Sequence, residues 1–383
     1  MSAADAPTLV RTLRLRGAVD AAALRAAWRG VRGRPMARLL AWEGGTQWLL
    51  ARLGALGLED AVAADLRAAL RARAAAERAR CLLVDAEAEG VVRYLGERGV
   101  PCVLIKGTAR RAAGARYPGA DARATVDVDL LLPAERVREV WDDLRARGWP
   151  FAGDPALTPP GHFHLPPLQG PNRVGVELHS ATGAPVAAAE AWRRAWSGEE
   201  VEWHGLRVRV PPATELLWHG LTHALGGGAA GFRLRCFLDA AAVVASGVPI
   251  DWDLVSARLA AGAEADPRLA ASWLGAAVDL AGPPLPEAPG VGGPRFDVVR
   301  ALAWRLAVLG GGDGSFRERL LEEGTRTELG VRTTPVVEGT GPLRQARRWV
   351  AGRVARLAYH GWRAASRGGG GGGARGSVAW ASP

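Results

Sequence analysis

The spacing of apolar and polar positions divides the chain into two helical parts around a central stretch with strand character. In residues 1–98, apolar side chains recur every three or four positions among Ala, Leu, Arg and Glu, which favour helices. This pattern predicts helices over 20–31, 36–54 and 59–97, with Gly99 as the stop of the last one. After Pro211-Pro212 it predicts four more, over 213–226, 231–246, 251–261 and 267–281.

Between these parts the chain carries short apolar runs bounded by turn residues. The runs VPCVLI (100–105), TVDVDLLL (125–132) and RVGVELH (173–179) predict three strands. A strand or extended segment is expected over 162–168, and helices are expected after Lys106-Gly107-Thr108 to about Arg116 and over 134–147. Together these elements predict an α+β fold, with a small mixed β-sheet core flanked by N-terminal and C-terminal helical regions.

The same changes of pattern suggest a division of the chain into five parts. They are an N-terminal helical region (1–98), a sheet-containing core (99–212), a helical domain (213–282), a linker with C-terminal helices (283–367) and a Gly-rich tail (368–383) that we expect to be disordered.

Two carboxylates on the second predicted strand are the first sign of chemistry. Asp127 and Asp129 are two positions apart, so their side chains share one face of the strand. Adjacent negative charges on a mostly buried strand are costly unless a cation compensates them. Oxygen ligands in this arrangement suit Mg²⁺, with Mn²⁺ as the alternative. A solvent-facing strand edge would also explain the pair, so it does not define a metal site by itself.

Glu177 strengthens the metal hypothesis. It lies on the third predicted strand, on the same face as His179 and opposite to the apolar positions. If this strand pairs with the one that carries Asp127 and Asp129, the three carboxylates form one cluster. Three carboxylates around two metal ions suit in-line attack on a phosphate, with Glu177 as a third ligand or as the base for an acceptor hydroxyl. His179 would orient Glu177 or have a purely structural role.

Lys106 stands out because it is the single lysine among 49 basic residues. It comes at the end of the first predicted strand, followed by Gly107 and Thr108. A lysine ammonium is a compact charge suited to phosphate, a glycine lets the backbone approach a ligand, and a threonine hydroxyl can donate a hydrogen bond. These three residues therefore predict contacts to a nucleotide triphosphate, although a tight turn would explain the Lys-Gly-Thr sequence on its own.

The run LIKGTARRAAGARYPGADARATVDVDLLLP resembles the signature of a largely uncharacterised family of bacterial nucleotidyltransferases in the DNA polymerase beta-like superfamily. The matching features are a Lys-Gly pair opening a helix, a Tyr-Pro turn, Arg123 four residues before Asp127, and a later Val-Glu-Leu-His strand. Further matching positions are His164, Pro166-Pro167, His219, His223 and Asp239. The resemblance implies nucleotide transfer without naming the acceptor. Arg123 would stabilise triphosphate charge or pair with an acid.

The net charge of +10 is concentrated at the C-terminal end. Residues 341–383 hold eight arginines and no acidic residue, so the first 340 residues carry only +2. A helix is expected over 342–366, with an apolar stripe and a basic surface. It could contact nucleic acid or a membrane surface, but we favour a docked helix with a solvated basic face.

The remaining features bound the location and the competing functions. The three cysteines form no CxxC pair, and the sequence shows no signal peptide and no apolar run of the ~18–20 residues that a spanning helix needs, so we expect a cytoplasmic protein. We expect an enzyme that moves a nucleoside monophosphate from an NTP to a small molecule or peptide and releases pyrophosphate. The alternatives are a non-catalytic nucleotide- or metal-binding module and a DxD glycosyltransferase, which would need a parallel α/β half before Asp127.

Overall fold

The computed structural model describes residues 5–31, 33–114, 123–158, 161–183, 186–226, 233–282 and 296–309. All of these residues fall within one compact unit, 1–310. The linker expected after 282, the basic helix expected over 342–366 and the Gly-rich tail lie outside the described residues. The finer division of the chain into five parts stays a prediction.

The N-terminal region is helical, as its sequence pattern predicts. Its helices are α1 (Asp5–Leu13), α2 (Ala21–Trp28), α3 (Gly33–Glu43), α4 (Thr46–Ala55) and α5 (Ala64–Glu97). Asp20 caps α2 by accepting a hydrogen bond from the Ala23 N–H at 2.9 Å. The helix predicted over 36–54 is two helices, because Gly44 adopts a φ of +71° and ends α3.

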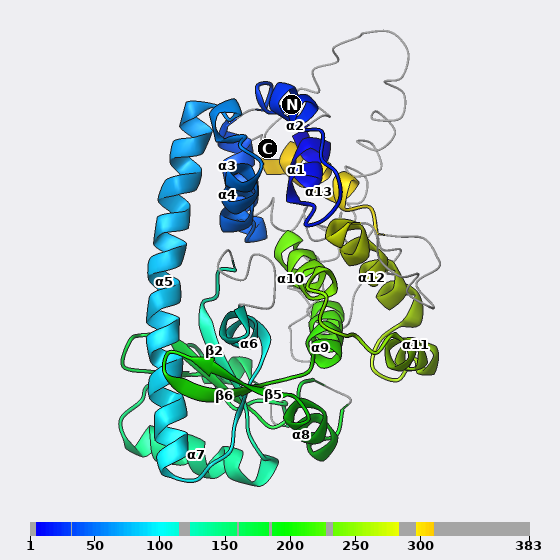
Figure 1. Ribbon diagram of the computed structural model, residues 1–383. Helices are drawn as coiled ribbons and strands as arrows, with labels where there is room; N and C mark the ends of the chain where they lie inside the picture. The colour runs from blue at the N-terminus through cyan, green and yellow to red at the C-terminus, as the bar shows by residue number, and fades with distance from the viewer. Residues whose placement is uncertain are drawn as a thin grey trace, which may run out of the picture. The chain divides into compact units, whose positions relative to one another are not determined.

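Helix α5 links the N-terminal helices to the sheet. It packs against α3 and α4 and, further along, against strand β2 (Asp127–Leu131) (Figure 1). Its buried stripe includes Leu66, Leu70, Val91 and Leu95, whereas Leu82, which the pattern placed on this stripe, is 67% exposed. The helix continues through Gly90 and ends as predicted just before Gly99, which adopts a φ of +63°.

The core contains a six-stranded mixed sheet, which confirms the predicted fold class. The strands are β1 (Val103–Leu104), β2 (Asp127–Leu131), β3 (Leu168–Gln169), β4 (Gly175–His179), β5 (Glu199–Trp203) and β6 (Leu206–Val210). Their order is β3-β4-β2-β1-β6-β5. The β2–β4 and β1–β6 pairs are parallel, and the other neighbours are antiparallel.

The hairpin β5–β6 was not predicted from the sequence. Its two central turn residues, His204 and Gly205, have φ angles of +50° and +72°, which is typical of the tight turn that matches the twist of a hairpin. Most of β5 is exposed and acidic, because it forms the edge of the sheet. A strand with so few buried apolar positions has little of the alternation on which sequence prediction depends.

Helices cover the sheet and continue from it. Besides α5, the helices packed against strands are α6 (Lys106–Ala112), α7 (Ala134–Ala146) and α8 (Ala188–Trp196). The later helices are α9 (Ala213–Gly226), α10 (Leu234–Ala245), α11 (Trp252–Ala261), α12 (Pro267–Ala281) and α13 (Val298–Leu309). The four helices predicted over 213–281 are thus present, and α13 is an addition.

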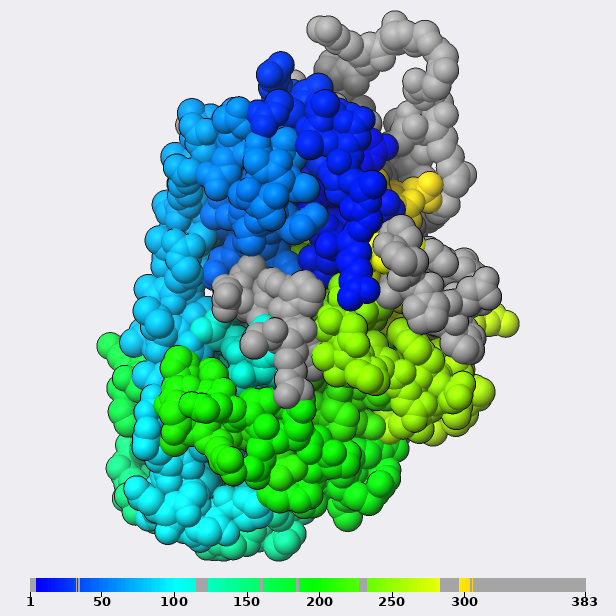
Figure 2. Space-filling model, in the orientation of Figure 1, coloured from blue at the N-terminus to red at the C-terminus, as the bar shows by residue number. Residues whose placement is uncertain are grey.

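The C-terminal helices of the described part return to the N-terminal ones. Helix α10 packs on α12, where the Phe237 and Trp273 rings stack at 5.2 Å, and α13 packs on α1 and α3. In Figure 2 the N-terminal helices (blue) lie next to the residues of the later helices (yellow-green), away from the sheet region at the other end. No helix among the described residues is long and apolar enough to cross a membrane.

Candidate active site

The pairing of β2 with β4 brings the predicted carboxylates together. In this parallel pair, Asp129 lies opposite Glu177, Asp127 opposite Gly175 and Leu131 opposite His179. Register partners on adjacent strands project to the same face of a sheet. Asp127, Asp129, Glu177 and His179 therefore share one face, as the sequence analysis expected.

Apolar residues fix the two strands beneath and beside this face. Val128, Leu130 and Leu132 are fully buried, which agrees with the predicted alternation. Val126, which the same alternation placed in the core, is 54% exposed because it precedes the first paired residue of β2. Leu131 continues the carboxylate face into a buried cluster with Val103 on the neighbouring strand β1 and with Ile105, which precedes α6.

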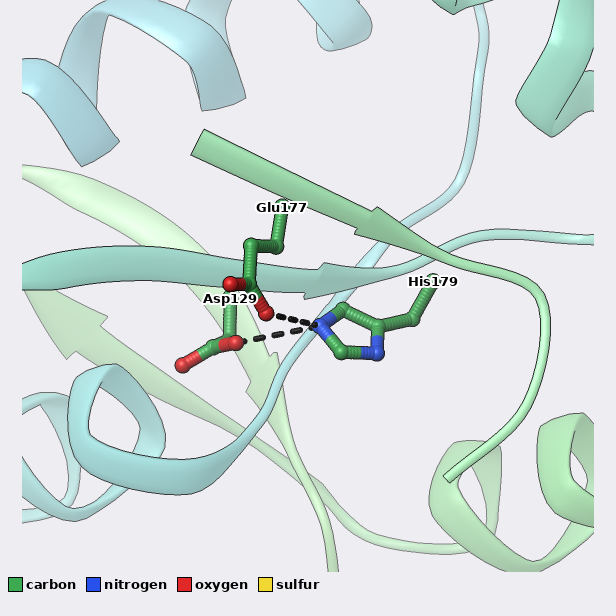
Figure 3. Close-up of side chains that lie close together, drawn as sticks. All are labelled: Asp129, Glu177 and His179. Atoms are coloured by element: carbon green, nitrogen blue, oxygen red, sulfur yellow. Dashed lines mark hydrogen bonds and ion pairs between the residues drawn. The ribbon is translucent and has the colours of Figure 1, made fainter. Parts of the chain in front are cut away.

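Two carboxylates of the site share two nitrogen partners. The Lys106 Nζ lies 2.8 Å from Asp129 Oδ1 and 3.2 Å from Glu177 Oε2. The His179 Nε2 lies 3.0 Å and 3.2 Å from the same two oxygens (Figure 3). Asp129 is 2% exposed and His179 is fully buried. The pair is thus held by two nitrogen groups at the buried end of the site.

His179 acts here as a hydrogen-bond donor. Its Nε2 faces two carboxylate oxygens, which only accept, so this nitrogen carries the proton. The buried Nδ1 has no hydrogen-bond partner among the described residues. A histidine that binds a metal through one nitrogen normally donates its other N–H to an acceptor. The arrangement therefore favours a His179 that orients the carboxylates, although its nitrogen and an oxygen of Asp129 and Glu177 lie within 4.8 Å of one another.

Lys106 occupies a strained backbone position. It is the first residue of α6 and adopts a φ of +50°. A left-handed backbone at a residue other than glycine costs about 1–3 kcal/mol and is found mostly at functional sites. From this backbone position the Lys106 side chain extends to the carboxylates, and the side chain is only 17% exposed.

Opposite charges keep Lys106 and Glu177 ionised. Burial alone would lower the pKa of Lys106, but the carboxylates of Asp129 and Glu177 outweigh it and raise that pKa. Burial would likewise raise the pKa of Glu177, but the hydrogen bond from His179 and the charge of Lys106 hold it well below its usual range. A carboxylate with so low a pKa is a weak base, which favours a ligand role for Glu177 over a role as general base.

Asp127 differs from the other two carboxylates. It is half-buried and forms no ion pair with another described residue. Burial, followed by repulsion from Asp129 and Glu177, raises its pKa from 3.8 to about 6. Asp127 is therefore the carboxylate of the site that has no ion pair among the described residues, although the charges of Lys106 and Arg123 act on it from further away.

We expect Asp127→Asn to stabilise the metal-free protein at pH 7 by about 1–2 kcal/mol, since about 1.4 kcal/mol accompanies each unit of pKa and solvent screens part of it. The folded-state pKa lies above the unfolded value of 3.8, so the folded wild type binds more protons between pH 3.8 and about 6. Its free energy of unfolding therefore falls as pH rises through that window, and the variant should not share this fall. Urea unfolding in EDTA at pH 4.5 and pH 7 measures both. A variant that is equally or less stable than wild type at pH 7 would contradict the prediction.

Gly107 is required by its neighbours in the structure. A Cβ at this position would lie 2.6 Å from the Thr125 Oγ1 and 2.8 Å from the Arg123 Nη1. The Arg123 guanidinium packs there while it pairs with Asp239 on α10, at 3.1 Å between Nη2 and Oδ2. Of the two roles that the sequence analysis left open for Arg123, the structure displays the pairing with an acid.

Gly107→Ala is expected to destabilise the protein by about 1–3 kcal/mol, the usual cost of overpacking. The new methyl group would displace the guanidinium of Arg123 and weaken its pairing with Asp239. The matched control is Gly90→Ala within α5, where an added Cβ meets nothing within 4 Å. That change should stabilise the helix by about 0.5–1 kcal/mol. Denaturant unfolding of the two variants should therefore shift in opposite directions, and equal shifts would count against this reading.

Thr108 lies behind the carboxylates. It is fully buried, and its hydroxyl donates to the backbone carbonyl of Asp127 at 3.4 Å. It thereby connects the start of α6 to the first residue of β2.

Five histidines lie around the site, of which the sequence analysis had singled out four. His162 was missed, together with Phe163, which stacks on His179 at 5.8 Å between ring centroids. His164 pairs with His179 across a β-bridge and lies 3.9 Å from Glu177, between Nε2 and Oε2. The clustered run His-Phe-His was the available signal, since three aromatic rings in succession are rare in a loop.

The histidines of α9 face the same charges. Burial, followed by nearby positive charge that includes Lys106, lowers the pKa of His223 to about 4. Burial also lowers the pKa of His219 well below its ordinary value. Both are neutral at pH 7, so they add no positive charge to that of Lys106 and Arg123.

Residues 34–274 match the family model described as an uncharacterised nucleotidyltransferase. The chain belongs to this family. The match covers more than half of the chain and includes every candidate residue of the site, which confirms the family resemblance and supports a nucleotidyltransferase role. No curated protein and no solved structure matches the chain.

Proposed function

We propose that this nucleotidyltransferase moves a nucleoside monophosphate from an NTP to an acceptor, releasing pyrophosphate, with Asp127, Asp129 and Glu177 as the metal ligands. The observation that carries the proposal is the register of the parallel pair β2–β4. It sets Asp129 beside Glu177, with Asp127 on the same face two residues earlier. Carboxylates so placed are the ligands that two-metal phosphoryl transfer requires.

The charge of the site fits a divalent cation. Three carboxylates lie near one ammonium, that of Lys106, and near the guanidinium of Arg123, which is already paired with Asp239. Asp127 has no ion pair among the described residues. Oxygen donors are preferred by Mg²⁺ and Mn²⁺. Bound there, such an ion would stabilise the charge that develops on the phosphate and lower the pKa of an attacking hydroxyl.

The residues around the carboxylates have separate roles in this proposal. Lys106 would contact the phosphates, because its ammonium already lies at the edge of the carboxylate pair. Arg123, fixed by Asp239, adds positive charge next to Asp127. Gly107 makes room for that guanidinium, and Thr108 supports the triphosphate site by holding the backbone of Asp127.

The structure argues against one of the two alternative functions, the glycosyltransferase, and leaves the other, the binding module, to experiment. A glycosyltransferase of the DxD type would need a parallel α/β half before Asp127, whereas the described residues up to Glu97 form helices. A non-catalytic binding module shares the carboxylates with the enzyme, and the two differ only in turnover.

Calorimetric titration with each of the four NTPs, with and without Mg²⁺, tests the proposal. We expect metal-dependent binding of at least one NTP by the wild type and its loss in Asp127→Asn/Asp129→Asn. Asp142→Asn on α7 is the matched control, because the Asp142 side chain is 60% exposed and lies near an exposed partner, Arg138. Binding that needs no metal, or that survives the double change, would overturn the assignment of the ligands. Binding without pyrophosphate release in the presence of cell-extract metabolites would favour the binding module.

A further inference from the structure

We propose that Lys106 is a resident counter-cation that keeps the Asp129–Glu177 pair from binding a divalent ion until a nucleotide engages the ammonium. This inference deepens the proposed function and rests on it. It makes metal binding and nucleotide binding cooperative, through a residue of the chain itself.

Lys106 occupies the carboxylates on which a divalent ion would depend. The Lys106 Nζ lies within 3.2 Å of a carboxylate oxygen of Asp129 and of one of Glu177. Asp127, by contrast, has no ion pair among the described residues. The side chain is 17% exposed, and its partner Asp129 is 2% exposed. An ion pair at this depth is screened far less by water than a surface pair.

The residue type and the backbone conformation at position 106 also favour a cation that moves. The chain places its single lysine here, among 48 arginines, and holds it at a φ of +50°. An ammonium is a compact charge on a flexible stem and can exchange one set of oxygens for another, whereas a guanidinium prefers a fixed, two-pronged geometry. A mobile point charge suits a cation that must leave the carboxylates and move to phosphate.

The consequence follows from linkage. While Lys106 neutralises the pair, it opposes a divalent ion by direct repulsion and by competition for the oxygens. Phosphate groups offer the ammonium an alternative partner and so release the carboxylates. By thermodynamic reciprocity, the nucleotide then increases the affinity for the metal by the same factor by which the metal increases the affinity for the nucleotide.

The decisive experiment measures Mn²⁺ affinity in the absence of nucleotide, from the electron paramagnetic resonance signal of free Mn²⁺. Lys106→Met removes the ammonium and keeps the approximate length of the side chain. We expect it to bind Mn²⁺ at least about tenfold more tightly than the wild type. Lys106→Arg keeps a cation at the position and should not show the gain. Arg71→Met is the matched control for net charge, since Arg71 is 60% exposed on α5 and pairs with Glu59.

An affinity for Mn²⁺ that is unchanged or lower in Lys106→Met overturns the inference, and so does the absence of binding in both proteins. Circular dichroism and thermal unfolding verify that each variant is folded. Lys106→Met/Asp129→Asn should lose the gained affinity, which assigns the gain to this site. If Lys106→Met binds Mn²⁺ more tightly but no NTP binds the wild type, the inference about Lys106 is supported and the proposed nucleotidyl transfer is contradicted. If NTP binds with metal but Lys106→Met gains nothing, the transfer stands and the resident cation fails.

Discussion

Asp129→Asn should reduce nucleotidyl transfer by a factor of about 10³ or more, with the folded structure retained. A metal ion contributes several kcal/mol of transition-state stabilisation in phosphoryl transfer, and each 1.4 kcal/mol is a factor of ten in rate. Asp129 is the most deeply buried carboxylate of the site, at 2% exposed, and its Oδ1 accepts from both Lys106 and His179. The amide keeps the size of the side chain but removes the charge that holds a cation.

The variant also changes the free site in a way that can be measured without an acceptor. Lys106 and His179 both lose a charged partner, and Glu177 remains as the only carboxylate within hydrogen-bond distance of either among the described residues. Metal-dependent NTP binding should weaken in parallel with the transfer rate. Pyrophosphate release gives the rate, and calorimetry gives the binding.

Two controls separate loss of chemistry from loss of structure. Asp142→Asn, on the exposed side of α7, removes the same charge and should keep full activity. Thermal unfolding of Asp129→Asn should show a cooperative transition. Activity within tenfold of the wild type in a folded Asp129→Asn would contradict the role of Asp129 as a metal ligand.

The helices, and the strands β2 and β4 that carry the carboxylates, could be predicted from the sequence because local patterns determine them. The predicted helices over 213–226 and 267–281 coincide with α9 and α12, which have regular apolar spacing and, for α12, a capping Asp266. In the segment TVDVDLLL, alternation correctly placed Asp127 and Asp129 on one face. The hairpin after 198 was missed: its edge strand β5 is exposed and acidic, although β6 alternates apolar and basic residues as a half-buried strand should.

Partners that are distant in sequence could not be predicted from local patterns. Lys106 and Glu177 were proposed for different tasks, phosphate binding and metal binding, yet they form an ion pair in the structure. Gly107 was explained by the approach of a phosphate, whereas the structure explains it by the guanidinium of Arg123. In both cases the immediate neighbour was set by the pairing of strands and helices far apart in the chain, which no local pattern contains.

A buried ion pair between α3 and α13 is a further contact that local sequence patterns could not predict. Breaking it is expected to have the largest effect on stability. The Arg305 Nη1 lies 2.9 Å and 3.0 Å from the two carboxylate oxygens of Glu43, across 262 residues of sequence. Glu43 also accepts the N–H of Leu234, at the start of α10, at 2.6 Å. Both charged residues are at most 1% exposed. One carboxylate thus connects three helices that no local pattern relates.

Arg305→Met should lower the free energy of unfolding by about 3–5 kcal/mol, since it leaves a buried carboxylate without its counter-charge. Glu43→Leu/Arg305→Met should recover part of that loss, because apolar residues can replace a buried ion pair at little net cost, whereas the N–H of Leu234 loses its acceptor. Urea unfolding followed by circular dichroism measures both. Arg136→Met, which breaks an exposed pair with Glu139 on α7, is the matched control and should cost less than about 1 kcal/mol.

The loss caused by Arg305→Met should also depend on pH. Burial already raises the pKa of Glu43 above its ordinary value of 4.5, and Arg305 is the main opposing influence. Without Arg305 the pKa rises further, so the folded variant binds a proton that the unfolded chain releases above pH 4.5. The free energy of unfolding of the variant, relative to the wild type, should therefore fall as pH rises from 4.5 towards 7.5. A difference that stays constant over this range would show that Arg305 stabilises α13 by packing, and that the charge of Glu43 is compensated by other groups.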